Sequence, residues 1–266
     1  MMRINPRNKA DQEALAKFRT LIPELAFYDE RSAERQLRIN ALINGYKTLE
    51  RYYDFIASHA ENQAVLRENL TYLGTTFFRG KAWPEFKNVC QDLIASSGDE
   101  KLRIWCAGCS SGKEAYSVLM VLLDYIPANK IELLATDYNH TMLERCEEAI
   151  YPLSTIEDIP SEYWRHLEKH IPGKFRVREE LREIVRTGVL DLLEDDYPKG
   201  FDIILCRNVM KFFEPGAKSL VQRKLAEALN SGGILFVSDE LEKEGIPDSE
   251  MMGLCQIGNY PLYRKR

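Results

Sequence analysis

Hydrophobic residues recur at helical spacing through the first 80 residues of the chain. One apolar stripe runs over residues 10–21, a second over 29–42, a third over 49–56 and a fourth over 65–70. Apolar positions three and four residues apart line one face of an α-helix. No part of this region has the pattern of a strand. We therefore predict a small all-α N-terminal domain over residues 1–80.

After residue 80 the pattern changes. One more amphipathic helix is expected around residues 83–93, and short apolar runs then alternate with longer amphipathic segments. The strand candidates are 102–106, 131–136, 201–206 and 234–238, the last after a turn at 231–233, and the helix candidates between them include 112–125 and 216–230. This alternation is typical of a parallel sheet with helices on both faces. We predict an α/β domain over residues 81–266.

Residues 151–190 interrupt this alternation. The segment Lys174–Arg178 alternates apolar and polar residues, and so does part of Glu183–Gly188. A period of two residues is typical of strands. We predict a small antiparallel β element inserted here as a hairpin, together with one more strand of the main sheet.

The charge balance argues against a nucleic-acid partner. The 266 residues include 36 Lys and Arg against 41 Asp and Glu, a net charge of −5. Proteins that bind nucleic acid by neutralising phosphates carry basic surfaces. The first 80 residues have 12 basic and 10 acidic side chains, a surplus of +2, which leaves −7 for the remainder. The predicted N-terminal domain is the more basic part, which suits an acidic protein surface.

Nothing in the sequence predicts export or membrane insertion. No run reaches the ~18 apolar residues that a membrane span needs, and the first residues lack the apolar core of a signal peptide. The six cysteines are spread among apolar runs and are expected to be reduced, buried thiols. We expect a cytoplasmic protein without stable membrane insertion.

The loop after the first predicted strand is rich in small residues. It covers residues 107–114 and contains Gly108 and Gly112. Small residues let the backbone approach a ligand closely, and the helix that follows offers its N-terminal amides. The second predicted strand is followed by Asp137, placed as the acidic residue that binds the ribose in Rossmann-type folds. These features together predict a nucleoside-binding site.

The two common phosphate-binding motifs do not fit this loop. A P-loop has four residues between its glycines, followed by Lys and then Ser or Thr. Here three residues separate Gly108 from Gly112, and Glu114 follows Lys113. The dinucleotide fingerprint Gly-x-Gly-x-x-Gly is also absent from the chain. S-adenosylmethionine, which has a ribose but no phosphate, suits these features, and a plain strand–helix turn without a ligand is the alternative.

The candidate metal ligands are not suitably spaced. Cys106 and Cys109 lack the second pair that a zinc site needs. His166 and His170 share a helical face, but no Glu follows the first His as in the H-E-x-x-H motif. We predict no metal site.

Four segments resemble, in order, the signatures of CheR-type chemotaxis receptor methyltransferases. They are Thr75–Arg79, Trp105–Ser117, Ala135–Asp137 and Phe201–Met210. The resemblance covers about residues 70–240. It implies a Rossmann-like class I methyltransferase domain, preceded by a small helical domain that docks on the receptor.

The resemblance also implies a protein-glutamate O-methyltransferase. Such an enzyme transfers the methyl group of S-adenosyl-L-methionine to glutamate carboxylates of a chemoreceptor (methyl-accepting chemotaxis protein), and releases S-adenosyl-L-homocysteine, in sensory adaptation. Carried over by motif position, the cofactor contacts are Thr75, Arg79, Glu114, Asp137, Asp191, Leu192, Arg207 and Asn208, to which the loop adds Gly108. Arg79 would also lie near the transferred methyl group and is the candidate catalytic residue.

This chemistry does not need a catalytic base. Methyl transfer to a carboxylate is an in-line displacement at a sulfonium, and glutamate, with a pKa of about 4.3, is already ionised at neutral pH. The enzyme has to align donor and acceptor and remove water from both. An arginine such as Arg79 can orient the carboxylate through a charge-assisted hydrogen bond.

Several positions depart from the family pattern. Leu73 stands in place of Asn, Phe212 in place of Tyr and Ala115 in place of Pro; Asp191 occupies a position that is often Asn, and the segment after Val237 differs. These changes leave two alternatives. One is a catalytically weak CheR-like module that binds S-adenosylmethionine, and the other is a carboxyl methyltransferase for another protein or a small acid.

Two features concern the receptor partner. One helical face is shared by Arg31, Arg35 and Arg38. The family resemblance favours a basic stripe that docks on the receptor's cytoplasmic helical bundle. The alternative is a solvated face paired with nearby glutamates. The predicted hairpin tip, His170–Lys174, is short. Some family members carry a glycine-rich loop there that captures a peptide at the receptor tail, and we expect no such pentapeptide tether here.

Overall fold

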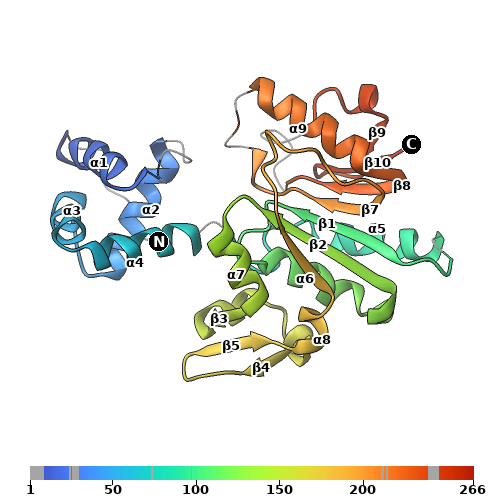
Figure 1. The fold of residues 1–266 in the computed structure, drawn as a ribbon, viewed down its shortest axis with the longest axis horizontal. Helices are drawn as coiled ribbons and strands as arrows, with labels where there is room; N and C mark the ends of the chain where they lie inside the picture. The colour runs from blue at the N-terminus through green and yellow to red at the C-terminus, as the bar shows by residue number, and fades with distance from the viewer. Residues whose placement is uncertain are drawn as a thin grey trace. The chain divides into compact units, whose positions relative to one another are not determined.

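The computed structural model describes residues 9–23, 25, 30–72, 75–96, 98–210, 213, 215–238 and 246–266. Contacts within the chain divide it into two compact units, Met1–Gly74 and Thr75–Arg266 (Figure 1). The predicted boundary after Gly80 lies six residues further along the chain than this division. The reason is that Phe77 is buried in the core of the second unit and Phe78 packs against the same core.

The described part of the first unit is helical, as predicted. Its α-helices are α1 (Lys9–Leu21), α2 (Glu30–Ile43), α3 (Leu49–Ser58) and α4 (Ala60–Tyr72). Their apolar faces form a core that includes Phe18, Leu37 and Tyr52. Helix α3 begins after Thr48 because the Thr48 side chain accepts a hydrogen bond from the Arg51 N–H.

The second unit is built on a seven-stranded sheet in the order β6-β2-β1-β7-β8-β10-β9 (Figure 1). The parallel strands are β1 (Leu102–Ala107), β2 (Ile131–Asp137), β6 (Val185–Val189), β7 (Phe201–Leu205) and β8 (Leu229–Phe236). The helices between them include α5 (Trp83–Ser96), α6 (Lys113–Leu122), α7 (His140–Glu148) and α9 (Pro215–Ala228). This confirms the α/β class predicted from the alternation of strands and helices.

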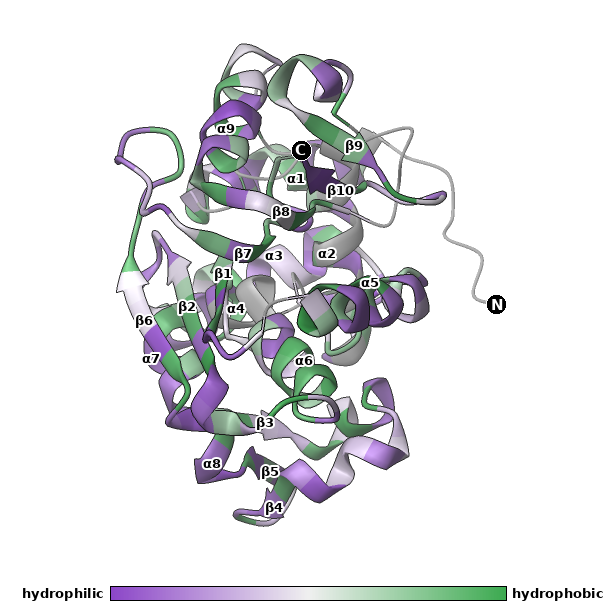
Figure 2. Ribbon diagram, turned by 90° about the vertical axis from the view of Figure 1, so that its right-hand side faces the viewer, coloured by the Kyte–Doolittle hydropathy of each residue, from purple (hydrophilic) through white to green (hydrophobic). Residues whose placement is uncertain are grey.

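Each face of the sheet has its own apolar core. Ile104 of β1 packs in a cluster with residues of α5, α6 and α7, whereas the next residue, Trp105, packs in a second cluster with residues of α9. This division follows because successive side chains of a strand point to opposite faces. All residues of α6 except Glu114 are buried, and the helix is apolar over most of its length in Figure 2.

The predicted insertion is a separate antiparallel sheet in the order β3-β5-β4. It consists of β3 (Ile150–Pro152), β4 (Leu167–Lys169) and β5 (Lys174–Val177), and the short helix α8 (Glu179–Arg182) follows it. The Tyr151 ring of β3 meets the Phe77 ring edge-on, with ring centres 4.9 Å apart, so the insertion packs on the core of the second unit. As predicted, β6 then joins the main sheet, parallel to β2.

The C-terminal part of the sheet differs from the prediction. Strand β8 begins at Leu229 and includes residues 231–233, which were expected to form a turn. A register shift against β7, between Phe201 and Ile203, accommodates these small residues. Two further strands, β9 (Leu254–Gln256) and β10 (Leu262–Lys265), were not predicted. Strand β10 pairs antiparallel with β8, and β9 pairs antiparallel with β10. No helix among the described residues is long and apolar enough to cross a membrane.

Candidate cofactor-binding site

The loop between β1 and α6 is a tight turn held against β2. The N–H groups of Gly108 and Cys109 both donate to the Thr136 carbonyl, at 2.8 and 2.9 Å. Gly112 has a φ of 80°, and a Cβ atom there would lie 2.4 Å from the Cys146 sulfur. Only glycine fits this position. The loop therefore brings the N-terminus of α6 to the carboxyl end of the sheet without bulky side chains.

Asp137 ends β2 and joins that strand to the same loop. One carboxylate oxygen accepts the Ser110 N–H at 2.8 Å, and the other accepts the Asn139 N–H at 3.0 Å. Burial raises the pKa of Asp137 above its ordinary value, and hydrogen bonds from backbone N–H groups oppose the rise. A carboxylate oxygen has two lone pairs, so the ionised group could also accept the two hydroxyls of a ribose.

Arg207 follows β7 and lies inside the protein, with 1% of its side chain exposed. Its Nη1 is 2.6 Å from Glu114 Oε1, and its Nη2 donates to the Arg79 carbonyl at 2.7 Å. The guanidinium also lies 4.3 Å from the centre of the Phe236 ring. A buried charge is tolerated where it is paired and hydrogen-bonded. We interpret Arg207 as a residue that ties α6 and the end of β7 to the segment that carries Arg79.

Arg79 and Thr75 lie on the segment that precedes α5. The Arg79 carbonyl accepts a second hydrogen bond, from Trp83 Nε1 at 2.9 Å. The Thr75 carbonyl accepts one from Lys113 Nζ at 3.2 Å. Both Thr75 and Arg79 are half-buried. Because their main chain is hydrogen-bonded to α5 and α6, the fold fixes the positions of the Cα atoms of Thr75 and Arg79.

The remaining predicted cofactor contacts follow β6 and β7. The Leu190 N–H donates to the Asp137 carbonyl at 3.2 Å, which brings the chain beyond β6 alongside the end of β2. Of the two residues that follow, Asp191 is exposed and Leu192 is buried. Asn208, after β7, has a φ of 59°, a left-handed conformation in which asparagine is enriched.

These residues meet at the carboxyl ends of the parallel strands. The strands β6, β2, β1 and β7 are neighbours, and the strand order reverses at β1. Open α/β sheets bind ligands at the carboxyl ends of their strands at such a reversal. The loops after these strands carry Gly108, Asp137, Asp191, Leu192, Arg207 and Asn208, and the contacts of Arg207 attach Glu114 and Arg79.

Other predicted residues lie outside the described part of the chain. They include Leu73, Phe212 and residues 239–240, which depart from the family pattern. Arg31 and Arg35 belong to α2, but their side chains are not among those described.

Arg38, the third residue of the predicted basic stripe, is engaged within the first unit. Its guanidinium lies 2.8 Å from Asp11 and 2.9 Å from Glu34, and 15% of its side chain is exposed. The pair with Glu34 is the local pairing that the sequence allowed as an alternative. The pair with Asp11 joins α2 to α1.

Sequence reasoning missed Lys113 and Ser117 of α6. The Ser117 hydroxyl accepts the Phe78 N–H at 3.0 Å, and Lys113 binds the Thr75 carbonyl. One signal was available, because Lys113 stands at the N-terminus of a mostly apolar helix, where the helix dipole disfavours a positive charge.

No metal-binding group of three His, Cys, Asp or Glu residues occurs in the described ranges. Cys106 and Cys109 are buried free thiols.

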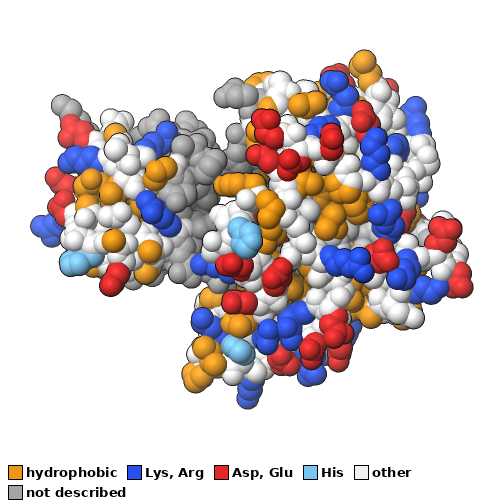
Figure 3. Space-filling view, in the orientation of Figure 1, with side chains coloured by type: hydrophobic (Ala, Val, Ile, Leu, Met, Phe, Trp, Pro, Cys, Tyr) orange, Lys and Arg blue, Asp and Glu red, His pale blue; other side chains and the backbone are white. Residues whose placement is uncertain are grey.

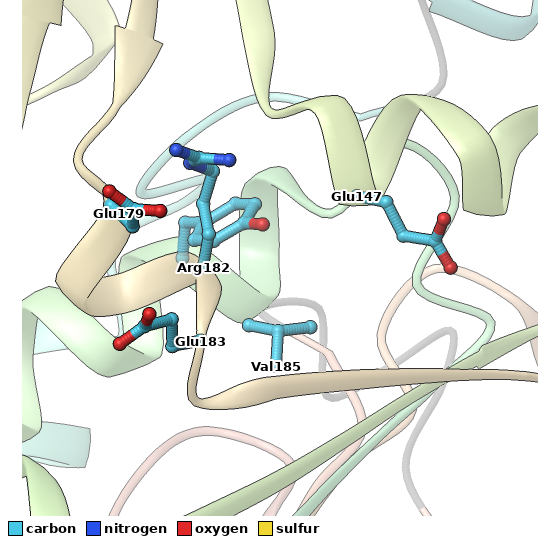
Figure 4. A pocket seen from close by; sticks show the side chains of 6 residues that line it. Glu147, Glu179, Arg182, Glu183 and Val185 are labelled. Atoms are coloured by element: carbon cyan, nitrogen blue, oxygen red, sulfur yellow. The ribbon is translucent and has the colours of Figure 1, made fainter.

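A surface pocket of about 190 Å³ lies apart from this site (Figure 4). Its lining consists of Tyr116, Glu147, Glu179, Arg182, Glu183 and Val185. Val185 is the first residue of β6, whose last residue, Val189, is paired with Asp137. The pocket is therefore at the opposite end of the strand from the candidate cofactor site.

The donors and acceptors at the sheet edge fit S-adenosylmethionine. Asp137 is placed for the ribose, and Gly112, the N-cap of α6, makes no side-chain cap, so the first-turn amides are suited to a carboxylate. Lys113, whose amine a phosphate site would need, is 2% exposed, and the amine donates to the Thr75 carbonyl instead. The lysine that a P-loop would direct at a phosphate is therefore engaged with the main chain here.

A mostly parallel sheet with a nucleoside site of this kind defines a class I methyltransferase that depends on S-adenosylmethionine. Residues 74–251 match the family model "CheR methyltransferase, SAM binding domain". The chain belongs to this family of methyltransferases.

Relatives with chemotaxis names align over most of the chain. A chemotaxis protein methyltransferase from Listeria monocytogenes is 31% identical over 243 residues, which are 89% of this chain and 90% of that protein. One from Borreliella burgdorferi is 30% identical over 73% of this chain and 74% of its own length. A solved TehB-like SAM-dependent methyltransferase from Corynebacterium glutamicum is 16% identical, with a TM-score of 0.41, over 79% of this chain and 100% of that chain.

Proposed function

We propose that this methyltransferase modifies glutamate side chains in the cytoplasmic helical bundle of a chemoreceptor, forming glutamyl methyl esters and S-adenosyl-L-homocysteine. The observation that carries the proposal is the attachment of Arg79, whose carbonyl is held by Arg207 and Trp83. Through Arg207 this segment is joined to the sheet edge at which Asp137 ends β2. An arginine there suits an anionic acceptor. The names of the relatives from Listeria and Borreliella support an acceptor in chemotaxis.

In the proposed mechanism the protein positions two reactants and moves no proton. Bound S-adenosylmethionine supplies an electrophilic methyl group. Asp137 and the β1–α6 loop hold the nucleoside. Arg79 orients the acceptor carboxylate toward the methyl group and offsets part of the free-energy cost of removing the carboxylate from water. The acceptor is already ionised at neutral pH, since the pKa of glutamate is about 4.3, and no general base is needed.

The first unit would dock on the receptor through α2. Arg31 and Arg35 are the candidate contacts, whereas the ion pairs of Arg38 within the unit favour a structural role for that residue. Acidic and basic side chains are interspersed over the face of the second unit in Figure 3, which supports a protein partner rather than nucleic acid. The short tip His170–Lys174 favours docking without a pentapeptide tether. Because the proposed partner is the cytoplasmic bundle of the receptor, the protein would act in the cytoplasm.

The test is transfer of labelled methyl groups to membranes that contain a methyl-accepting chemoreceptor. Label released as volatile methanol by mild base identifies a glutamyl ester. Arg79→Ala should abolish this transfer, because the acceptor loses its orienting charge. Arg186→Ala, which removes an exposed arginine of the edge strand β6, is the matched control and should retain it.

Three results would contradict the proposal. Equal rates for the wild type and Arg79→Ala would remove the role of Arg79. Binding of S-adenosylmethionine without transfer to any receptor would favour the binding-module alternative. Transfer to a small carboxylic acid, but not to receptor membranes, would favour a different acceptor.

A further inference from the structure

The segment Thr75–Arg79 is attached at both ends to the first turn of α6. At one end, Lys113 Nζ donates to the Thr75 carbonyl at 3.2 Å. At the other end, Glu114 pairs with Arg207 at 2.6 Å, and Arg207 donates to the Arg79 carbonyl at 2.7 Å. Two consecutive residues of one helix therefore reach the two ends of the segment that carries the candidate catalytic arginine.

Ser117, one turn further along α6, holds the middle of the same segment. Its hydroxyl accepts the Phe78 N–H at 3.0 Å and donates to the Lys113 carbonyl at 2.8 Å. Phe78 has a φ of 42°, a conformation that bulky side chains rarely adopt unless their surroundings impose it. The hydrogen bond from its N–H to Ser117 is one of the contacts that impose it.

Lys113 is an unusual residue to find at this place. It is 2% exposed, in a helix whose only residue that is not buried is Glu114. Its amine lies 5.9 Å from the centre of the Tyr151 ring. Burial lowers the pKa of Lys113 to about 8. A buried amine stabilises a fold less than an apolar side chain of the same size would, so its presence here favours a role in the site.

We propose that Lys113 and Ser117 are positioning residues for methyl transfer. They fix the main chain of Thr75–Arg79 against α6, the helix whose N-terminus closes the cofactor loop, so that the groups for cofactor and acceptor belong to one rigid body. This inference rests on the proposed roles of Thr75 and Arg79. A small displacement of reacting groups can cost a large factor in rate, so loosening the segment should slow transfer without unfolding the protein.

The experiment compares Lys113→Met, Ser117→Ala and Lys101→Met with the wild type. Methionine is unbranched and only one atom shorter than lysine, and it removes the donor. Lys101 is a matched control, because 56% of its side chain is exposed and its ion pair with Glu132 lies at the start of β1, away from the cofactor edge. For each protein, kcat and KM are measured with receptor membranes, affinity is measured by calorimetry with S-adenosyl-L-homocysteine, and thermal unfolding is recorded.

For Lys113→Met and Ser117→Ala we expect kcat to fall roughly tenfold or more at saturating cofactor, with a smaller change in the KM for receptor. The unfolding midpoint of Lys113→Met should not fall, and Lys101→Met should behave as the wild type. A kcat within about twofold of the wild type for both variants would overturn the inference. A loss of activity that only accompanies a lowered unfolding midpoint in both would also overturn it, since that is a structural role.

Failure of the proposed function gives a different result. If the wild type binds S-adenosyl-L-homocysteine but does not methylate receptors, the choice of acceptor is wrong. The positioning of the segment is then judged by affinity alone. Weaker binding of S-adenosyl-L-homocysteine by Lys113→Met, with an unchanged unfolding midpoint, would support it, and unchanged affinity would refute it.

Discussion

Replacing Lys113 by methionine removes two opposing contributions of this side chain to stability. The lysine carries a positive charge into the core of the second unit, where it is 2% exposed. It also donates a hydrogen bond to the Thr75 carbonyl. Methionine has a similar length and removes both at once, so the free energy of unfolding of Lys113→Met reports their balance.

The cost of the charge follows from the pKa. Burial lowers the pKa of Lys113 from 10.5 to about 8. At about 1.4 kcal/mol per pKa unit, the charged amine destabilises the folded state at neutral pH by about 3 kcal/mol. Loss of the hydrogen bond to Thr75 costs about 1–3 kcal/mol. Lys113→Met is therefore expected to be as stable as the wild type at neutral pH, or up to about 2 kcal/mol more stable.

The sign of the pH dependence follows from proton binding. In the unfolded chain Lys113 keeps its proton up to its ordinary pKa of 10.5, whereas in the folded protein it loses the proton near pH 8. Between these values the unfolded state binds more protons, so the wild type gains stability relative to Lys113→Met as the pH rises. By about pH 9.5 this gain amounts to about 2 kcal/mol, and it is lost again as the pH falls through 8.

The assay is urea unfolding followed by tryptophan fluorescence at neutral pH and at about pH 9.5. The three tryptophans, Trp83, Trp105 and Trp164, all belong to the second unit, so the signal reports the unit that contains Lys113. Comparison of the two proteins at each pH cancels the contribution of every other titrating group. Lys101→Met removes an exposed charge, and its difference from the wild type should stay constant.

Two results would refute this reasoning. A difference between Lys113→Met and the wild type that is the same at both pH values, within about 0.5 kcal/mol, would mean that the charge is not destabilised by burial. A loss of more than about 3 kcal/mol at neutral pH would exceed what the bond to Thr75 explains.

Two further predictions concern the cofactor loop. Asp137→Asn removes the negative charge proposed to bind the ribose and should weaken the affinity for S-adenosyl-L-homocysteine by roughly tenfold or more in calorimetry. Asp92→Asn, at an exposed position, is the control, and equal affinities would exclude Asp137 as a cofactor contact. Gly112→Ala combines a φ of 80° with a Cβ 2.4 Å from the Cys146 sulfur, and should lower the free energy of unfolding by about 2–4 kcal/mol. Gly98→Ala, with a φ of 63° and open space around it, should lower the free energy of unfolding by only about 1 kcal/mol. Equal losses for the two variants would mean that the β1–α6 loop rearranges to accommodate the Cβ added at Gly112.

The periodic parts of the fold were predictable because period and length distinguish strands from helices over enough residues. The helices of the first unit each bury one apolar face, whereas β1, β2 and β7 are short apolar runs that contact the cores on both faces of the sheet. Strands β9 and β10 have three and four residues, too few to show a period. Their place is set by the antiparallel pairing of β10 with β8 and of β9 with β10, which no local pattern encodes.

The sequence could place the residues of the candidate site at strand ends and in motifs, but it could not predict the contacts of their side chains. The end of the second predicted strand indicated Asp137, since ligands gather where parallel strands end, whereas Arg207 was indicated by the family resemblance. The attachment of Arg207 to the Arg79 carbonyl joins residues 128 positions apart. Similarly, the spacing of Arg31, Arg35 and Arg38 indicated a shared face, but the pairing of Arg38 with Asp11 depends on how α1 packs against α2.

The chemistry explains why the buried polar side chains of the site bind the main chain. In a reaction that moves protons, such side chains would serve as acid and base. In the proposed reaction the glutamate acceptor is already ionised, and the rate depends on alignment. Lys113 and Arg207 accordingly donate to the carbonyls of Thr75 and Arg79, and Asp137 accepts backbone N–H groups of the loop. A carbonyl oxygen does not titrate, so an alignment built on main-chain atoms depends on pH only through its side-chain partners. Among these partners, Lys113, with its pKa near 8, titrates closest above neutral pH.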